Sequence, residues 1–121
     1  MRVLVADDNV VNRRMIRMLL GALGHTVDVV EDGALACLAT QTQVYDVVLL
    51  DLNMPVMDGR EAVVSMRARG KPAPRLIIVT ADNTAESYAA CMAAGADGVE
   101  TKPLDLAKLS SIMAETASAL M

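Results

Sequence analysis

Aromatic residues are scarce in this chain, which has no Phe, no Trp and two Tyr among its 121 residues. Because 54% of the residues are nonetheless hydrophobic, we expect a core built from aliphatic side chains. A length of 121 residues matches one domain, residues 1–121, and leaves no room for a second of ordinary size. The chain is therefore predicted to bury a single aliphatic core.

Positive charge is also limited, since 11 Lys and Arg against 15 Asp and Glu give a net charge of −4. Direct binding to nucleic acid needs a basic face, so we expect no nucleic-acid partner. No apolar run approaches the ~20 residues of a membrane-spanning helix, and charge follows the first apolar run too soon for a signal peptide. The cysteines Cys37 and Cys91 lack metal-ligand spacing and are interpreted as reduced structural thiols. We expect a cytoplasmic protein without a membrane segment.

Five short apolar runs recur along the chain, with longer helical segments between them. The runs are Val3–Ala6, Thr26–Val30, Val47–Leu50, Arg75–Thr80 and Gly98–Thr101. Three of them consist almost entirely of Val, Ile and Leu, which is typical of strands covered on both faces. Five alternations of strand and helix predict an α/β fold in which a doubly wound, five-stranded parallel sheet carries helices on both faces.

Boundary signals between these runs predict where helices begin, end and face the core. Capping-box spacing is found at two pairs, Asp58 with Glu61 and Asn83 with Glu86. Glycines fall where three helices should end, at Gly24, Gly70 and Gly95. A turn is predicted at residues 72–74.

Apolar stripes predict the buried faces of the first and last helices. The first stripe is Val11, Met15 and Leu19, and the last is Leu109, Ile112, Met113 and Leu120. Three arginines, Arg13, Arg14 and Arg17, lie on a different face of the first helix. We interpret them as a solvated face, with a docking patch as the alternative.

Polar side chains stand at the carboxyl ends of the predicted strands, where open α/β sheets bind ligands. They are Asp7, Asp8, Asp51, Thr80 and Lys102. Adjacent carboxylates repel one another, and a hard cation such as Mg²⁺ relieves the repulsion in an all-oxygen site. A carboxylate, Mg²⁺, a lysine and a threonine hydroxyl together are equipped for phosphoryl transfer to aspartate. The alternative is that each residue is simply a solvated loop residue. Glycine-rich nucleotide fingerprints and P-loops are absent from the sequence.

Four segments resemble the receiver domain of two-component response regulators, a family that includes chemotaxis regulators. They are residues 3–9 (VLVADDN), 49–59 (LLDLNMPVMDG), 79–81 (VTA) and 101–103 (TKP). The segments stand in the family's order, and the resemblance covers essentially the whole chain. It implies a flavodoxin-like fold with strand order 2-1-3-4-5.

The resemblance also implies a role for individual residues at the site. Asp51 corresponds to the phosphoacceptor, Asp8 to a direct ligand of Mg²⁺, and Asp7 to its companion, which often acts through water. Asn53 would supply a backbone carbonyl to the metal. Lys102 corresponds to the lysine that pairs with phosphoryl oxygens, and its bond to the following proline is typically cis in the family.

Switching residues follow the family pattern with one departure. Thr80 corresponds to the hydroxyl that moves toward the phosphoryl group, and Ala81 to the small residue that leaves access to it. Most receivers carry an aromatic residue three positions before the lysine, where this chain has Val99. A branched aliphatic side chain cannot swing inward as an aromatic ring does, so the usual coupling is not expected here.

A signalling role therefore follows from the resemblance. A histidine kinase or a histidine phosphotransfer protein would phosphorylate Asp51, and phosphorylation would change binding to a downstream protein whose identity the sequence does not reveal. We expect a regulatory phosphoacceptor rather than an enzyme, beyond self-catalysed phosphorylation and dephosphorylation. The run Asp8-Asn9 followed by Asn12-Arg13 favours a receiver excised from a hybrid sensor kinase over a stand-alone receiver.

Two alternative functions remain open from the sequence. One is a phosphohydrolase that works through an aspartyl-phosphate, although those enzymes generally carry a second Asp where this chain has Asn53. The other is a pseudo-receiver that binds partners without phosphorylation, against which the intact set of site residues argues.

Overall fold

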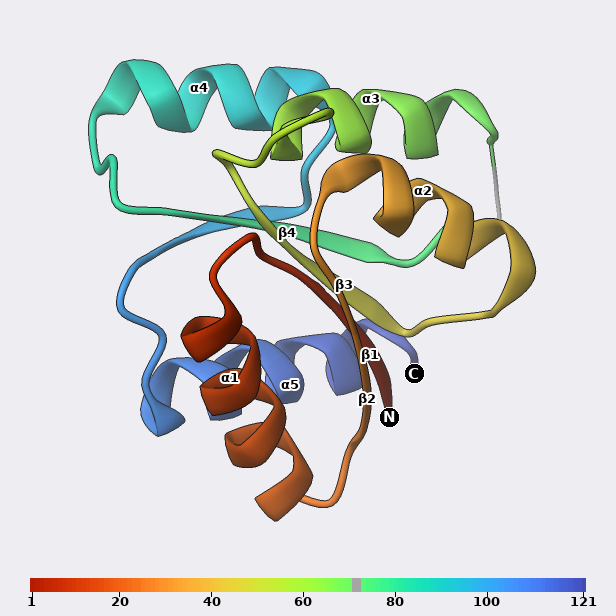
Figure 1. The fold of residues 1–121 in the computed structure, drawn as a ribbon, viewed down its shortest axis with the longest axis vertical. Coiled ribbons are helices and arrows are strands. Elements are labelled where there is room, and N and C mark those ends of the chain that lie inside the picture. Colours follow the sequence, from red (N-terminus) through yellow and green to blue (C-terminus); the bar gives the residue numbers. More distant parts are fainter. Residues whose placement is uncertain (71–72) are drawn as a thin grey trace.

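Strands and helices alternate along the chain in the computed structural model, which describes residues 1–70 and 73–121 (Figure 1). The strands are β1 Arg2–Ala6, β2 Thr26–Val30, β3 Val47–Asp51, β4 Arg75–Thr80 and β5 Gly98–Thr101. The helices are α1 Val10–Ala22, α2 Gly33–Thr42, α3 Gly59–Ala68, α4 Ala85–Ala94 and α5 Leu106–Ala119. Every predicted strand is confirmed to within one residue at each end.

All strand pairs are parallel, and the sheet order is β2-β1-β3-β4-β5, as the resemblance implies. The register pairs Ala6 with Leu50, Asp51 with Val79, and Thr80 with Thr101. The central strands therefore finish at the same edge of the sheet. This edge is where the polar residues predicted from the sequence should meet.

Helices cover both faces of the sheet, with α1 and α5 on one face and α2, α3 and α4 on the other (Figure 1). Alternate strand residues point to opposite faces, so each face has its own core. The core beneath α1 and α5 takes its strand residues from Val3, Val5, Val27, Val47, Leu49, Ile77 and Val79. The core beneath α2, α3 and α4 takes them from Leu4, Ala6, Val48, Leu50, Leu76 and Ile78. Both cores are almost wholly aliphatic, as the composition predicts.

Helix ends agree with most of the boundary signals. The capping box of α3 is confirmed, since the Asp58 carboxylate accepts from the Glu61 N–H and the Glu61 side chain accepts from the Asp58 N–H. Gly24, Gly70 and Gly95 each adopt a positive φ at the end of a helix. The turn predicted at residues 72–74 lies partly outside the described residues.

The predicted cap of α4 at Asn83 is wrong. The N-cap is Thr84, whose hydroxyl accepts from the Ser87 N–H at 3.2 Å. Asp82 causes the shift, because its carboxylate accepts from the Thr84 N–H at 2.9 Å and holds Thr84 in an extended conformation. The helix therefore begins one residue later than the sequence spacing suggests.

The predicted stripe of α1 is confirmed only at Leu19, which packs against the core, whereas the buried residues of the helix are Ile16 and Leu20. Val11, at the start of the predicted stripe, is 68% exposed, and Met15 and Leu19 are half-buried. In α5 the stripe is confirmed at Leu109, Ile112 and Met113. Leu120 lies beyond the helix and is exposed, and Thr116 takes the buried position by donating its hydroxyl to the Ile112 carbonyl at 2.7 Å.

Close backbone packing joins α3 to the edge where the site lies. A Cβ atom on Gly59 would approach the Asp51 carbonyl oxygen to 2.5 Å, so this position accepts only glycine. The Gly59 N–H donates to the Leu52 carbonyl at 3.0 Å and closes the loop after β3. Cys37 and Cys91 are buried free thiols, as predicted. None of the helices in the described residues is long and apolar enough to cross a membrane.

Candidate functional site

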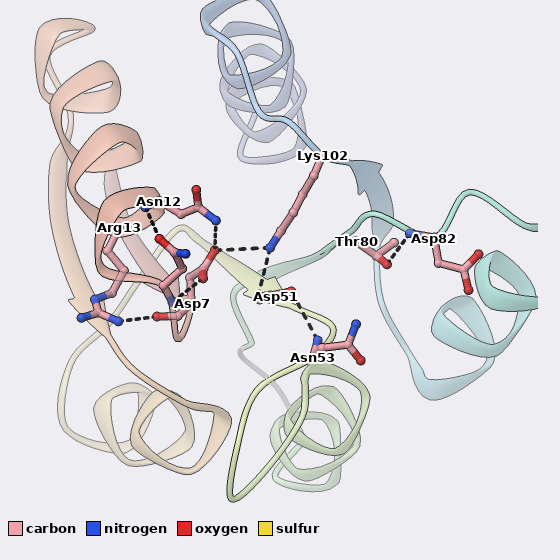
Figure 2. Close-up of polar contacts among 9 residues, drawn as sticks. Asp7, Asn12, Arg13, Asp51, Asn53, Thr80, Asp82 and Lys102 are labelled. Carbon is pink, nitrogen blue, oxygen red and sulfur yellow. Dashed lines mark hydrogen bonds and ion pairs between the residues drawn. The ribbon is translucent and has the colours of Figure 1, made fainter.

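Three carboxylates converge at the carboxyl ends of β1 and β3, and Figure 2 shows two of them, Asp7 and Asp51. Asp7 and Asp8 directly follow β1, and Asp51 is the last residue of β3. Each offers a carboxylate oxygen, and these oxygens lie within 4.8 Å of one another. Asp7 and Asp51 are 3% and 6% exposed, whereas Asp8 is exposed. The site is therefore a buried acidic pair with a third carboxylate at its mouth.

Lys102 bridges the two buried carboxylates from the loop between β5 and α5. Its Nζ donates to Asp51 Oδ2 at 3.0 Å and lies 3.6 Å from Asp7 Oδ2. The Lys102 N–H donates to the Thr80 carbonyl at 2.8 Å, and the following bond to Pro103 is cis, as the resemblance implies. Burial disfavours the ammonium, but the bonds to Asp51 and then Asp7 outweigh this and raise the pKa of Lys102 above 10.5.

Asp51 is held on both carboxylate oxygens. Oδ2 accepts from Lys102, and Oδ1 accepts from the Asn53 N–H at 3.3 Å. Burial nevertheless raises the pKa of Asp51 above 3.8, and the neighbouring Asp7 adds to the rise against the opposing effects of Lys102 and the Asn53 N–H. Burial penalises the charge of Asp51 more than that of Lys102, because the Asp51 side chain is 7% exposed and that of Lys102 is 27% exposed.

Thr80 lies at the end of β4 and is almost fully buried. Its hydroxyl oxygen accepts from the Asp82 N–H at 2.9 Å, on the side away from Lys102 (Figure 2). Asp82 and Thr84 then each accept from a backbone N–H two or three residues further on. These three side-chain to backbone hydrogen bonds in series connect the Thr80 hydroxyl to the first turn of α4. Ala81 is exposed beside Thr80.

Val99 is half-buried on β5 and packs against the core beneath α2, α3 and α4. Its register partner on β4 is Ile78, whose side chain belongs to the same core. The branched side chain is thus a packing residue on the sheet. The sequence places no aromatic residue there, and the structure puts Val99 on the same face as α4.

Asn9, Asn12 and Arg13 belong to the site, a role that was not predicted from the sequence. The Asn9 N–H donates to Asp7 Oδ1 at 2.9 Å, and Asn12 Nδ2 donates to Asp7 Oδ2 at 3.5 Å. Arg13 Nη1 donates to the Asp7 carbonyl at 2.7 Å (Figure 2). Arg13 is therefore not part of a solvated face. The only sequence signal was proximity, because all three follow Asp7 within two helical turns.

The donor set fits a hard divalent cation. Carboxylate oxygens within 4.8 Å of one another are the ligands that Mg²⁺ prefers, and the exposed Asp8 leaves one side open to the water molecules that Mg²⁺ usually retains. Lys102 supplies one positive charge to a cluster of three carboxylates, so negative charge remains in excess. The geometry can thus bind a cation beside Asp51.

Residues 3–114 match the family described as response regulator receiver domain. The chain is 37% identical over 120 residues to the sensory/regulatory protein RpfC of Xanthomonas campestris pv. campestris, covering 97% of this chain and 16% of that protein. It is 38% identical over 118 residues to the two-component response regulator ORR41 of Oryza sativa subsp. japonica, covering 94% of this chain and 92% of that protein.

A solved structure gives the same fold. The receiver domain of sensor histidine kinase PA1611 from Pseudomonas aeruginosa PAO1, described with a magnesium ion coordinated in its active-site cleft, is 34% identical and matches with a TM-score of 0.85. The match covers 94% of each chain. The relatives differ in size, since this chain corresponds to 16% of the length of RpfC but to 92% of ORR41.

Proposed function

This chain belongs to the response regulator receiver domain family of two-component phosphorelays, and we propose that Asp51 is the residue on which it accepts a phosphoryl group. Receiver domains are regulatory phosphoacceptors. In this proposal residues 1–121 form one such domain, and the donor is a histidine kinase or a histidine phosphotransfer protein. Mg²⁺ is the cofactor.

The observation that carries the proposal is the environment of Asp51. Its carboxylate is buried at the end of β3, paired with Lys102 at 3.0 Å, and accompanied by carboxylate oxygens of Asp7 and Asp8 within 4.8 Å. A nucleophilic carboxylate needs a cation on each side to accept a phosphoryl group that carries negative charge. Lys102 is one cation, and the carboxylates of Asp7 and Asp8, together with Asp51, would hold the other.

Phosphoryl transfer follows from these positions. An oxygen of the Asp51 carboxylate attacks phosphorus, the bond between phosphorus and the donor histidine nitrogen breaks, and the electron pair of that bond stays with the imidazole. Asp7, Asp8, Asp51 and the Asn53 carbonyl would hold Mg²⁺, whose charge would offset that of the phosphoryl oxygens. The Lys102 ammonium would pair with another phosphoryl oxygen, since phosphate carries more charge than the carboxylate it now contacts.

Switching would begin at Thr80. Its hydroxyl proton can be donated to a phosphoryl oxygen, and Ala81 is small enough to leave the approach open. Because the Thr80 oxygen accepts from the Asp82 N–H, turning it toward Asp51 releases the first bond of the series that reaches α4. Val99 would follow by small adjustments in packing, without a rotamer change.

The donor would approach beside α1, next to Lys102. A groove between α1 and the loop after β5 is lined by Met15, Pro103 and Leu104, and Lys102 also lines it. Val11 and Met18 are each 68% exposed on the same helix. An apolar surface next to the phosphoacceptor suits a histidine-bearing helix of a protein donor.

The relatives of this chain include both much longer proteins and one of similar length. A sensory/regulatory protein and a sensor histidine kinase, both much longer than this chain, match it, and so does a response regulator of similar length. We propose that the domain acts as a receiver in either setting, with no activity of its own beyond self-catalysed phosphorylation and dephosphorylation. The downstream partner is a protein that reads the conformation of the last helices and strand.

The test is labelling with acetyl phosphate, read by intact mass. We expect one phosphoryl group per chain in Mg²⁺, none in excess chelator, and none on Asp51→Asn in Mg²⁺. The control Glu31→Gln, which changes the same charge at an exposed residue outside the carboxylate cluster, should label as the parent does. Full labelling of Asp51→Asn would refute the assignment. Fast multiple turnover of acetyl phosphate without a phosphorylated intermediate would favour the phosphohydrolase alternative, and absence of labelling would favour the pseudo-receiver.

A further inference from the structure

Two neighbouring side chains of α1 contact Asp7 in ways that phosphoryl transfer itself does not require. Asn12 Nδ2 donates to Asp7 Oδ2 at 3.5 Å, and Arg13 Nη1 donates to the Asp7 carbonyl oxygen at 2.7 Å. The Asn12 contact is long and shared with Lys102, so it is weak. The Arg13 contact is short and charge-assisted, which makes it the stronger of the two.

The carbonyl that Arg13 holds belongs to the peptide unit joining Asp7 to Asp8. Because a peptide unit is planar, fixing its carbonyl also fixes the direction of the Asp8 N–H and the position of the Asp8 Cα. The other side of Asp7 is already fixed, since its N–H donates to the Val30 carbonyl at 3.2 Å. Arg13 thus completes the anchoring of the backbone between β1 and Asp8.

Asp8 depends on this anchoring more than its neighbours do. Asp7 and Asp51 are buried and paired with Lys102, whereas Asp8 is exposed. The direction of the Asp8 carboxylate is therefore decided chiefly by the backbone that carries it. Without the guanidinium, the Asp7–Asp8 peptide could rotate and turn the carboxylate toward water.

We propose that Arg13 is a positioning residue for the cation site: it holds the Asp7–Asp8 peptide so that the Asp8 carboxylate faces Asp7 and Asp51 before the metal binds. This inference rests on the proposed function, because it assigns Asp8 to the Mg²⁺ site. Arg13 would act by raising the affinity of the site for Mg²⁺. At saturating Mg²⁺ the ion itself draws Asp8 into place, and the rate of phosphorylation of Asp51 recovers.

Electrostatics alone predicts the opposite change in Mg²⁺ affinity when Arg13 is removed. Arg13 is a cation beside a cation site, so removing its charge should strengthen the attraction of Mg²⁺ to the carboxylates. If Arg13 acts by position, removing it should weaken Mg²⁺ binding. Residues that orient metal ligands typically change affinity by 10–100-fold, and because Arg13 acts through the backbone we expect roughly 10-fold.

The experiment compares Arg13→Met with Arg14→Met. Methionine keeps an apolar stem and a good helix propensity, and Arg14 is the exposed neighbour on the same helix, so both variants lose the same charge. Mg²⁺ is titrated into each folded protein, and backbone amide NMR shifts around Asp8 and Asp51 report the dissociation constant. We expect Arg13→Met to bind roughly 10-fold more weakly and Arg14→Met to bind as the parent or slightly more tightly.

Equal or tighter binding by Arg13→Met would overturn the inference, as would an equal loss in both variants. Should Arg13→Met not give a folded spectrum, Arg13→Gln with Arg14→Gln carries the same expectation. A second measurement separates positioning of Asp8 from a general loss of stability. When labelling by acetyl phosphate is followed against Mg²⁺ concentration, Arg13→Met should reach half-saturation at a higher Mg²⁺ concentration and should reach the same plateau as the parent. A reduced plateau at saturating Mg²⁺ would also overturn it.

Failure of the proposed function would look different. In that case the parent protein itself would show no Mg²⁺ titration that depends on Asp8, and Asp51 would not be labelled. If the parent binds Mg²⁺ through Asp8 and Arg13→Met binds it equally well, the proposed function stands and only the role of Arg13 falls.

Discussion

Replacement of Asp8 by asparagine should change stability in opposite directions with and without Mg²⁺. Two unit charges 4.8 Å apart repel by about 3.5 kcal/mol at an effective dielectric constant of 20 and by about 0.9 kcal/mol in water. Asp8 is exposed and Lys102 lies nearby, so the value near the aqueous limit applies. We therefore expect Asp8→Asn to raise the free energy of unfolding by about 0.5–1 kcal/mol in metal-free buffer.

Mg²⁺ should reverse this order. At ten times its dissociation constant, the ion adds about 1.4 kcal/mol to the unfolding free energy of the parent, and at one hundred times about 2.7 kcal/mol. With an unfolding entropy of about 2.1 cal/mol/K per residue, 121 residues give about 0.25 kcal/mol/K, so the lower figure corresponds to about 5–6 °C in Tm. Asp8→Asn loses one charged ligand, and most of this gain should disappear.

The assay is a pair of thermal melts, in chelator and in Mg²⁺, for the parent, Asp8→Asn and the control Glu31→Gln. Glu31 is exposed and outside the carboxylate cluster, so its variant controls for the change in net charge. The Tm of the parent and that of Glu31→Gln should rise equally in Mg²⁺. Both should therefore melt below Asp8→Asn in chelator and above it in Mg²⁺. An equal Mg²⁺ gain in all three proteins would refute the assignment of Asp8 as a metal ligand.

Three further outcomes follow from the site. Lys102→Ala removes the cation from the carboxylates of Asp7 and Asp51, whose side chains are 4% and 7% exposed. Urea titration in chelator should show that the free energy of unfolding falls by about 2 kcal/mol, between the values for surface and buried ion pairs. A fall of less than about 0.5 kcal/mol would contradict the pairing. Asp51→Asn should stabilise the metal-free protein, because burial raises the pKa of Asp51 above 3.8. The protonated Asp51 contributes its full stability below pH 3.8, and this contribution is lost as the pH rises through the raised pKa. The unfolding free energy of Asp51→Asn should therefore exceed that of the unsubstituted protein once the pH has risen through this range, and the difference should be absent below pH 3.8. On beryllofluoride binding, amide shifts should concentrate at Asp51, Thr80 and Asp82, and Thr80→Ala should abolish those at Asp82; shifts that persist there would show another route of coupling.

Strand positions were predictable from the sequence because the sheet is buried on both faces. Runs such as Val47–Leu50 contain no polar residue, so they are suited to a strand that is buried on both faces. The observed strand β3 contains this run and extends it by one residue, to Asp51. The polar residues at the strand ends followed directly, since parallel strands finish at one edge. Lys102 and Asp51 are separated by 51 positions in sequence and lie 3.0 Å apart for this reason.

The buried face of α1 was not predictable from periodicity alone. Two adjacent stripes have helical spacing, one through Val11 and one through Ile16 and Leu20, and a period of 3.6 residues cannot choose between them. The structure buries Ile16 and Leu20 in the core, and Asn12, four residues before Ile16, lies on the same side of the helix and contacts Asp7. In the other stripe, Val11 is exposed and Met15 and Leu19 are half-buried.

The cap of α4 and the role of Arg13 were missed for a related reason. Asn83 has the spacing of a capping box, but Asp82 bonds the Thr84 N–H first and moves the helix start. Arg13 reads as one of three arginines on a helix until the backbone carbonyl of Asp7 is placed within its reach at 2.7 Å. Side-chain bonds to backbone atoms depend on loop conformation, which sequence spacing does not specify.

The central claim is that Asp51 receives the phosphoryl group, and direct mapping of the modified residue tests it. The protein is phosphorylated in Mg²⁺ by a phosphorylated histidine phosphotransfer protein, the acyl phosphate is trapped by borohydride reduction, and peptides are sequenced by tandem mass spectrometry. We predict that the reduced residue is Asp51 alone and that Asp51→Asn yields none. A modified residue at Asp7, Asp8 or any other position, with Asp51 unchanged, would contradict the account.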